Sequence, residues 1–218
     1  MRRLLKSLLP TLSFALAFSG ASADDGCCCG LKRIPGCTTS TFSPEVNGYV
    51  RCTDASYPGA CGLTQVNVSG TTIDVKRSYT GVLYDVSHGV LTFDTSGLPD
   101  SATVQSAQIL LTSFFPFDGD GRSVVMGWFD PDSESYETFV FNSNNDAHAG
   151  TSLSVIGDDE RMAYALQNLT NVDKAGLSGL RIWINGGQPT DFNEVYYATT
   201  NSFEPPSEYP VLMIAWCS

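Results

Sequence analysis

The chain of 218 residues has only two histidines, His88 and His148. Neither lies in a Gly-x-Ser-x-Gly or His-Glu-x-x-His motif, so the sequence lacks the signatures of triad hydrolases and zincin-type metalloproteases. Paired carboxylates also serve glycosidases, but in a chain with 23 acidic residues such pairs arise by chance. We therefore expect that the protein is not an enzyme.

Basic residues are scarce as well, with 12 Lys and Arg against 23 Asp and Glu and a formal net charge of −11. A surface of this sign is poorly suited to the phosphate backbone, so we expect no nucleic-acid partner. Long apolar runs are missing too, since no segment reaches the roughly 20 residues that a membrane-spanning helix needs. We therefore expect no membrane span.

The first 23 residues have the pattern of a secretory signal peptide. Arg2, Arg3 and Lys6 form a positive start, residues 8–18 form a short apolar run, and residues 21–23 supply the small-residue cleavage pattern. The acidic residues just before the first cysteine do not suit a lipid anchor. We expect a secreted or cell-surface protein, whose formal charge falls to −14 because cleavage removes three basic residues and no acidic one.

Seven cysteines follow the signal peptide, and in an exported chain they indicate disulfides. Cys52 and Cys61 enclose a short loop and are predicted to pair. An odd number leaves at least one cysteine free or shared between molecules. Zinc is disfavoured, because the chain has no Cys-x-x-Cys pair and no histidine close to its cysteines. Residues 24–43, which contain the triplet Cys27-Cys28-Cys29, are interpreted as an irregular, cysteine-pinned extension.

From about Pro44 onwards, short alternating or apolar segments are separated by turn-forming residues. Residues 65–76 have the pattern of a β-hairpin around Ser69-Gly70, and helical turns fit only within 162–169 and 171–175. This pattern predicts an all-β fold over 44–218, an antiparallel two-sheet β-sandwich of the jelly-roll kind. Further strands are expected at 81–86, 90–94, 104–114, 123–129, 136–141, 153–156, 180–185, 194–198 and 211–216.

Two stretches resemble a known family. The segment VLTFDTSGLPDSATVQSAQILL and the closing segment SGLRIWINGG…NEVYYATTNSFEPPSEYPVLMIAW are similar to DNRLRE-type domains of secreted and cell-surface proteins, and Asn47-Gly48-Tyr49-Val50 resembles their opening strand. The resemblance spans roughly residues 45–216. It implies a jelly-roll β-sandwich with a non-catalytic role, either in carbohydrate binding or in building extracellular structures.

A candidate glycan-binding platform lies in the predicted strand LRIWIN, where aliphatic residues alternate with Arg181, Trp183 and Asn185. These three side chains share the face opposite the core if the aliphatic ones point inward. An exposed ring between hydrogen-bonding groups suits a sugar. Glu194 and Tyr196 extend this face if their strand is adjacent. In the alternative interpretation, a loop or the cysteine-rich extension covers Trp183.

Two acidic loops are candidate calcium sites, because carboxylates stand at alternate positions in both. Asp118 and Asp120 lie in the first loop, and Asp130, Asp132 and Glu134 lie in the second. Calcium takes six to eight oxygen ligands, but neither loop has the twelve-residue EF-hand pattern. Structural calcium is thus the one cofactor considered. The alternative is that both loops are solvent-facing turns.

Two functions remain open at this point. The first is a secreted binding module or adhesin that recognises an extracellular polysaccharide or a cell-surface glycan. The second is a self-assembling subunit of a fibre, sheath or surface layer, joined through the extension at 24–43 and cross-linked by an unpaired cysteine. A polysaccharide-degrading enzyme is the least favoured of the three interpretations.

Overall fold

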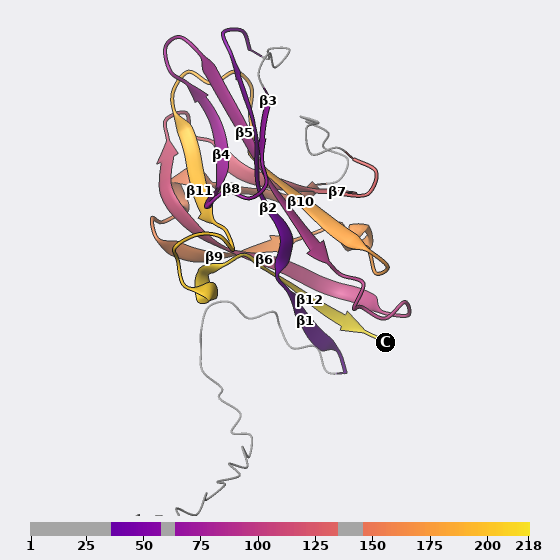
Figure 1. Ribbon diagram of the computed structural model, residues 1–218. Helices are drawn as coiled ribbons and strands as arrows, with labels where there is room; N and C mark the ends of the chain where they lie inside the picture. The colour runs from indigo at the N-terminus through magenta and orange to yellow at the C-terminus, as the bar shows by residue number, and fades with distance from the viewer. Residues whose placement is uncertain (1–35, 58–63, 135–145) are drawn as a thin grey trace, which may run out of the picture.

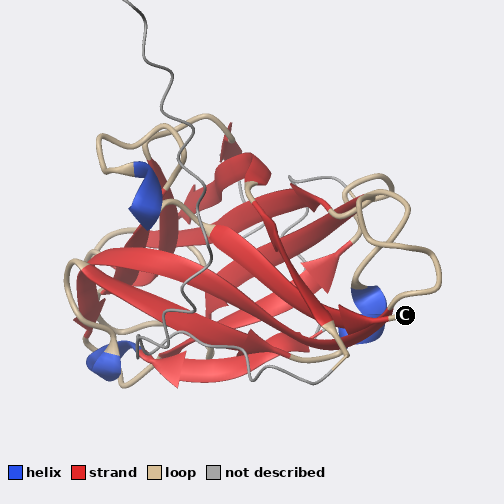
Figure 2. Cartoon of the chain, turned by 90° about the horizontal axis from the view of Figure 1, so that it is seen from below, coloured by secondary structure: helices blue, strands red, loops and turns tan. Residues whose placement is uncertain are grey.

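The computed structural model describes residues 36–57, 64–134 and 146–218. Strands dominate these residues, no α-helix occurs among them, and the 3-10 turns lie at the periphery (Figures 1 and 2). The strands are β1 (Thr38–Phe42), β2 (Pro44–Asp54), β3 (Thr64–Asn67), β4 (Thr72–Tyr79), β5 (Tyr84–Asp94), β6 (Thr103–Asp118), β7 (Ser123–Phe129), β8 (Asp146–Ser152), β9 (Glu160–Leu166), β10 (Leu177–Ile184), β11 (Asn193–Ala198) and β12 (Val211–Cys217). The 3-10 turns are η2 (Leu153–Val155), η3 (Leu169–Asn171) and η4 (Pro206–Glu208).

All strand pairs in the described residues are antiparallel, which confirms the predicted all-β class. The strands form one continuous curled sheet in the order β1-β12-β6-β11-β4-β5-β10-β7-β8, with β2, β3 and β9 attached beside this path (Figure 1). The sheet curls because β5 and β6 change neighbours along their length. One edge of β5 pairs first with β4 and then with β10. The predicted division into two separate sheets is not confirmed.

The hydrophobic core fills the concave side of this curled sheet. One cluster joins Ile109 and Leu111 of β6 with Val124 of β7, Ile182 of β10 and Ile214 of β12, all of them fully buried. Side chains from strands far apart in the sheet order therefore meet in one interior. Burying such aliphatic groups contributes roughly 1.5–3 kcal/mol per side chain, which makes this interior the main source of stability.

The segment VLTFDTSGLPDSATVQSAQILL folds as the end of β5, a crossing loop and the start of β6. The carboxylate of Asp94, at the end of β5, accepts hydrogen bonds from the backbone and hydroxyl of Ser96. The buried Thr95 hydroxyl donates to the carbonyl of Asp173 and lies 2.7 Å from the Ser178 hydroxyl. These short side-chain oxygens replace the ladder hydrogen bonds that end with the strand. The loop is thereby fastened to the start of β10.

Several local predictions are wrong because strand partners are distant in the sequence. Residues 65–76 do not form a hairpin, since β3 pairs with β2 and β4 pairs with β5 and β11. Residues 160–166 form β9 beside β6 rather than a helical turn. The strand expected at 153–156 is largely the 3-10 turn η2. The strand expected at 136–141 lies outside the described residues.

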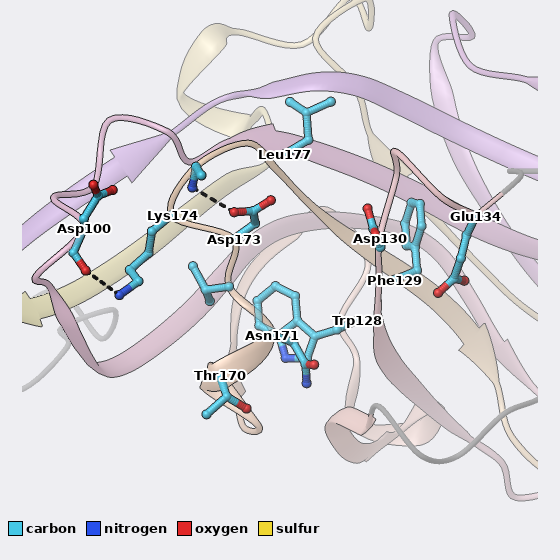
Figure 3. Close-up of a pocket in the computed structure, with 12 residues that line it drawn as sticks. Asp100, Trp128, Phe129, Asp130, Glu134, Thr170, Asn171, Asp173, Lys174 and Leu177 are labelled. Atoms are coloured by element: carbon cyan, nitrogen blue, oxygen red, sulfur yellow. Dashed lines mark hydrogen bonds between the residues drawn. The ribbon is translucent and has the colours of Figure 1, made fainter.

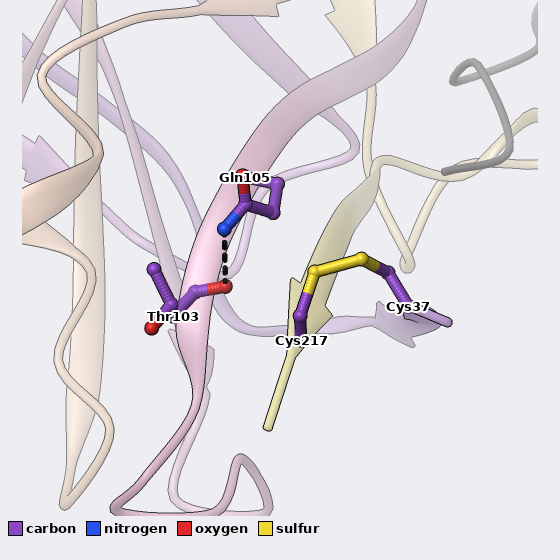
Figure 4. Close-up of a disulfide and its surroundings, with 4 residues drawn as sticks. All are labelled: Cys37, Thr103, Gln105 and Cys217. Carbon is purple, nitrogen blue, oxygen red and sulfur yellow. Dashed lines mark hydrogen bonds between the residues drawn. A yellow bond between two sulfur atoms is a disulfide. The ribbon is translucent and has the colours of Figure 1, made fainter. Parts of the chain in front are cut away.

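The cysteine-rich extension is partly regular. The irregular structure predicted through residue 43 is wrong for Thr38–Phe42, which form β1 and pair with β12. A disulfide joins Cys37 to Cys217, so the start of β1 is bonded to the end of β12 across a sequence separation of 180 residues (Figure 4). Residues 1–35, with the predicted signal peptide and the cysteine triplet, lie outside the described residues.

The predicted Cys52–Cys61 pair is tested only in part. Cys52 lies buried on β2 and is bonded in a disulfide. Cys61 lies outside the described residues, so this pairing stays a prediction. The Cys37–Cys217 bond was not predicted, because no spacing rule connects two cysteines at opposite ends of a chain.

Candidate functional site

The alternation predicted for β10 is confirmed, but the opposite face is buried at Arg181, half-buried at Trp183 and exposed only at Asn185, just after the strand. Leu180, Ile182 and Ile184 are fully buried in the core. Arg181 on the opposite face is only 4% exposed. Its guanidinium carbon lies 5.0 Å from the centre of the Phe129 ring, against a small second cluster of apolar residues. A guanidinium held in this way is not available to hydrogen-bond a sugar.

The other members of the predicted platform do not assemble around Trp183. This half-buried ring lies beside His88, with the ring centres 6.1 Å apart. The side-chain oxygen of Asn185 accepts a hydrogen bond from the backbone of Ser123, which ties β10 to β7. Glu194 and Tyr196 lie on β11, which is separated from β10 in the sheet by the two strands β4 and β5. The predicted platform is therefore wrong as a set.

The first acidic loop is held by protein donors. Asp120 accepts hydrogen bonds from the backbone and hydroxyl of Thr190, from the side chain of Asn193 and from the guanidinium of Arg122. The hydrogen bond from the Thr190 hydroxyl is the main reason why the pKa of Asp120 lies well below its usual range. Asp118 accepts from the backbone of Arg122. These carboxylates build the β6–β7 turn rather than a calcium site.

The second acidic loop follows β7, at the opposite end of that strand, so the two loops do not share an ion. Asp130 accepts hydrogen bonds from the Ser133 hydroxyl and from the backbone of Asp132. The bond from Ser133 is the main cause of the lowered pKa of Asp130. Nowhere in the described ranges do three or more His, Cys, Asp or Glu side chains form a group able to hold a metal. The loop geometry supports turns, and the predicted calcium ligands do not come together.

Asp130 and Glu134 instead line a pocket of about 490 Å³, with a mixed polar and apolar lining, between the end of β7 and the turn before β10 (Figure 3). Asp173 and Lys174 lie on its other side. The Lys174 ammonium donates to the carbonyls of Asp100 and Ala102, so it fastens the crossing loop. The polar groups around this pocket hold the loops together.

A second, more apolar groove of about 820 Å³ lies on the outer face of β4, β11 and β6. The core-facing side chains of these strands, such as Val75 and Val195, alternate with outward ones. Two rows of outward residues run across the three strands: Asp74, Tyr196 and Phe114 in one row, and Lys76, Glu194 and Phe117 in the other. Two of the five predicted glycan-binding residues, Glu194 and Tyr196, therefore lie together in this groove.

The floor of the groove is a coupled group of polar side chains. The ammonium of Lys76 lies 3.6 Å from a carboxylate oxygen of Glu194 and 4.6 Å from the centre of the Tyr196 ring. The Tyr196 hydroxyl donates to the same oxygen of Glu194 at 3.3 Å. Burial lowers the pKa of Lys76, but the interactions with Tyr196, Glu194 and Asp74 outweigh it and the pKa is raised. Burial raises the pKa of Tyr196, so its hydroxyl keeps its proton.

Phe115 projects into the groove because of a bulge in β6. Phe114 pairs with Tyr196 and Phe117 pairs with Glu194, so two residues of β6 stand opposite the single residue Val195. Phe115 has φ +49°, a left-handed conformation that is strained for a bulky residue. Its backbone N–H donates to the carboxylate of Asp158 at 2.8 Å. The ring is 70% exposed and meets the Tyr196 ring edge-on at 6.5 Å.

The rim of the groove is the loop that follows β11. Its Thr199 hydroxyl donates to the carbonyl of Gly70, and the side chain of Asn47 exchanges hydrogen bonds with Thr200. The loop presents Phe203, whose side chain is 100% exposed, together with Glu204. Exposure of this apolar ring to water is unfavourable, and the ring has no packing role within the described structure. The described lining of the groove thus combines four aromatic rings, of Phe114, Phe115, Tyr196 and Phe203, with three carboxylates and one ammonium group.

Sequence reasoning did not find Phe115 and Phe203. The available signal was the segment Phe114-Phe115-Pro116-Phe117, because proline inside a strand marks an edge or a bulge. Phe203 stands among turn-forming residues, where a large apolar side chain is unusual. Neither pattern shows that the two rings face one groove, because this depends on which strands are neighbours.

Comparison with known proteins adds no functional information: no protein-family model matches the chain, and neither does any curated protein. The resemblance to DNRLRE-type domains therefore stays a prediction. Within the described ranges, no helix is long and apolar enough to cross a membrane.

Proposed function

We propose that the chain is a secreted, non-catalytic protein that binds an extracellular polysaccharide or cell-surface glycan through the groove on β4, β11 and β6. The observation that carries this proposal is the group of Phe115, Tyr196 and Phe203 beside Asp74 and Glu194. Aromatic rings offer apolar planes to the C–H faces of sugars, and carboxylates accept hydrogen bonds from hydroxyls. The Cys37–Cys217 bond supports export, because disulfides persist in oxidising compartments.

The proposal includes a jelly-roll-like scaffold in which two halves of the curled sheet act as facing layers. One core cluster supports this, because it contains Leu111 of β6 together with Met126 of β7. Such a scaffold holds the groove on a rigid outer face. The backbone strain at Phe115 favours a binding role, because strained backbone conformations tend to persist at sites where the side chain serves a function.

Replacing Phe115 by asparagine is expected to weaken binding to a polysaccharide by about tenfold or more, with a change in the free energy of unfolding within about 1 kcal/mol. Asparagine tolerates a positive φ better than phenylalanine does. The relief of backbone strain therefore offsets the loss of the ring contact with Tyr196. Affinity electrophoresis in gels containing plant, algal or bacterial polysaccharides measures the binding. Urea unfolding measures the stability.

Phe192→Asn is the matched control, since Phe192 is an exposed phenylalanine that precedes β11 and does not contribute to the described lining of the groove. Its binding is expected to equal that of the unchanged protein. Equal binding by Phe115→Asn and the unchanged protein, on a polysaccharide that the protein retards, would remove the groove as the binding site.

The second candidate function is a disulfide-linked structural subunit. It is favoured by the position of β1, which forms one end of the sheet order and directly follows the cysteine-rich segment. Edge strands offer unpaired backbone groups to another chain. Non-reducing electrophoresis of the secreted protein is expected to give a single monomer band. A ladder that collapses with reductant would support the structural subunit instead.

A further inference from the structure

The charges in the groove are unbalanced. Its described lining contains the carboxylates of Asp74, Glu194 and Glu204 but only one cationic side chain, Lys76. Glu194 forms the salt bridge with Lys76. Asp74 accepts a hydrogen bond from the Thr72 hydroxyl, and neither it nor Glu204 forms a salt bridge with a cation within the described structure. The groove therefore carries a net negative charge in a chain of net charge −11.

The aromatic rings add to this negative potential. The face of an aromatic ring carries the negative end of its quadrupole and attracts cations. The Tyr196 ring already shows this behaviour, because the Lys76 ammonium lies over it. Phe115 approaches Tyr196 edge-on, with an interplanar angle of 83°, and Phe203 is fully exposed. These two rings remain available to a ligand that combines apolar C–H groups with positive charge.

From this combination we infer that the groove selects an amino-sugar polymer, whose hexosamine units carry free, protonated amino groups. The inference rests on the proposed function and narrows it to one class of glycan. The sugar C–H faces stack on Phe115 and Phe203, and an ammonium group pairs with Glu204, while the buried Asp74, 8% exposed, adds negative potential at the groove floor. Hydrogen bonds between ionised partners are roughly twice as strong as those between neutral groups.

Neutral and anionic glycans fit the same groove less well. A neutral sugar covers Glu204 without supplying a charge, so this carboxylate loses water without full compensation. A uronic acid or sulfated polymer brings like charges together, which is unfavourable in a partly desolvated site. The groove volume of about 820 Å³ lies within the range of ligand sites, and its position on an open sheet face admits a chain rather than a single sugar.

The test compares three hexamers on the full secreted chain: β-1,4-linked glucosamine, the same hexamer with all amino groups acetylated, and the corresponding glucose hexamer. Titration calorimetry at pH 6 is expected to show at least tenfold tighter binding of the glucosamine hexamer than of the other two. Raising the salt concentration from 50 to 300 mM is expected to weaken this binding several-fold, because exposed ion pairs are screened.

Glu204→Gln is expected to weaken binding of the glucosamine hexamer by about three- to tenfold and to leave the affinity for the acetylated hexamer unchanged. Glu45→Gln removes an exposed carboxylate from β2, outside the groove, and is the matched control with no expected effect. An equal loss in both variants, or binding that survives Phe115→Asn, would show non-specific attraction of a polycation and overturn the inference.

The outcomes separate this inference from the proposed function. If the acetylated or glucose hexamer binds as tightly as the glucosamine hexamer and depends on Phe115, the groove is a glycan site and the selection for amino groups is wrong. If no hexamer binds and the polysaccharide gels show no retardation, both proposals fail. Binding of the glucosamine hexamer alone, reduced by Glu204→Gln, supports both.

Discussion

Replacing both Cys37 and Cys217 by serine is expected to lower the free energy of unfolding by about 3–5 kcal/mol. The disulfide closes a loop with a sequence separation of 180 residues, and the entropy that a cross-link removes from the unfolded chain grows with the logarithm of loop length. A domain of ordinary size has a total stability of about 5–15 kcal/mol. The loss is therefore a large fraction of the total, and urea unfolding measures it directly.

The double variant is more informative than a reductant, which would also open the disulfide of Cys52. Ser40→Ala is the control, because it removes only the hydrogen bond from the Trp216 indole and leaves the cross-link intact. Its expected cost is about 1 kcal/mol. If the double variant lost no more free energy of unfolding than Ser40→Ala, the pairing of β1 with β12 would hold the end of the chain without help from the disulfide.

The sequence was most informative where a strand is buried on one face and its pattern is local. The alternation in LRIWIN correctly placed Leu180, Ile182 and Ile184 in the core. It did not reveal that the other face is buried at Arg181, beside Phe129, so Arg181 was taken for a surface residue. Alternation with a period of two shows which side chains share a face of a strand, but it does not show which of the two faces is exposed to solvent.

The long strand β5 shows a second limit. The sequence pattern predicts separate strands at 81–86 and 90–94, with a gap over residues 87–89. The structure has one strand over Tyr84–Asp94. At Gly89 an added Cβ atom would lie 2.5 Å from a methyl group of Ile73, so glycine permits the close approach where β5 changes neighbours. A glycine in the sequence fits a close approach between strands as well as a turn, so the sequence alone does not distinguish the two.

The candidate site was predicted only in part, for reasons of topology. Glu194 and Tyr196 were identified as outward residues of one strand, and the structure bears this out. The other residues that line the groove lie on β4, on β6 and in the loop after β11 rather than on β10. Local patterns show which residues share a strand face. Strand order is set by contacts between distant segments, and a single sequence does not supply it.

Acidification from about pH 6.5 to about pH 4.5 is expected to lower the free energy of unfolding by roughly 2 kcal/mol through His88 alone. His88 is buried, and its pKa is lowered from 6.5 to about 3, mainly by burial and further by the charges of Arg77 on β4 and Arg181 on β10. Below pH 6.5 the unfolded chain protonates this histidine and the folded protein does not. Protons therefore favour unfolding, and stability falls until the pH approaches 3.

His88→Gln is expected to flatten this dependence between pH 6.5 and pH 4.5, whereas His148→Gln, which changes the other histidine, is expected to keep it. The carboxylates of Asp94, Asp120 and Asp130 do not account for the fall, because their pKa values are lowered and they lose charge only at more acidic pH. If His88→Gln is too unstable to study, the slope for the unchanged protein near pH 5 should still correspond to about one more proton bound by the unfolded chain. A flat profile over this interval would mean that His88 is charged in the fold, with a negative group close enough to hold that charge.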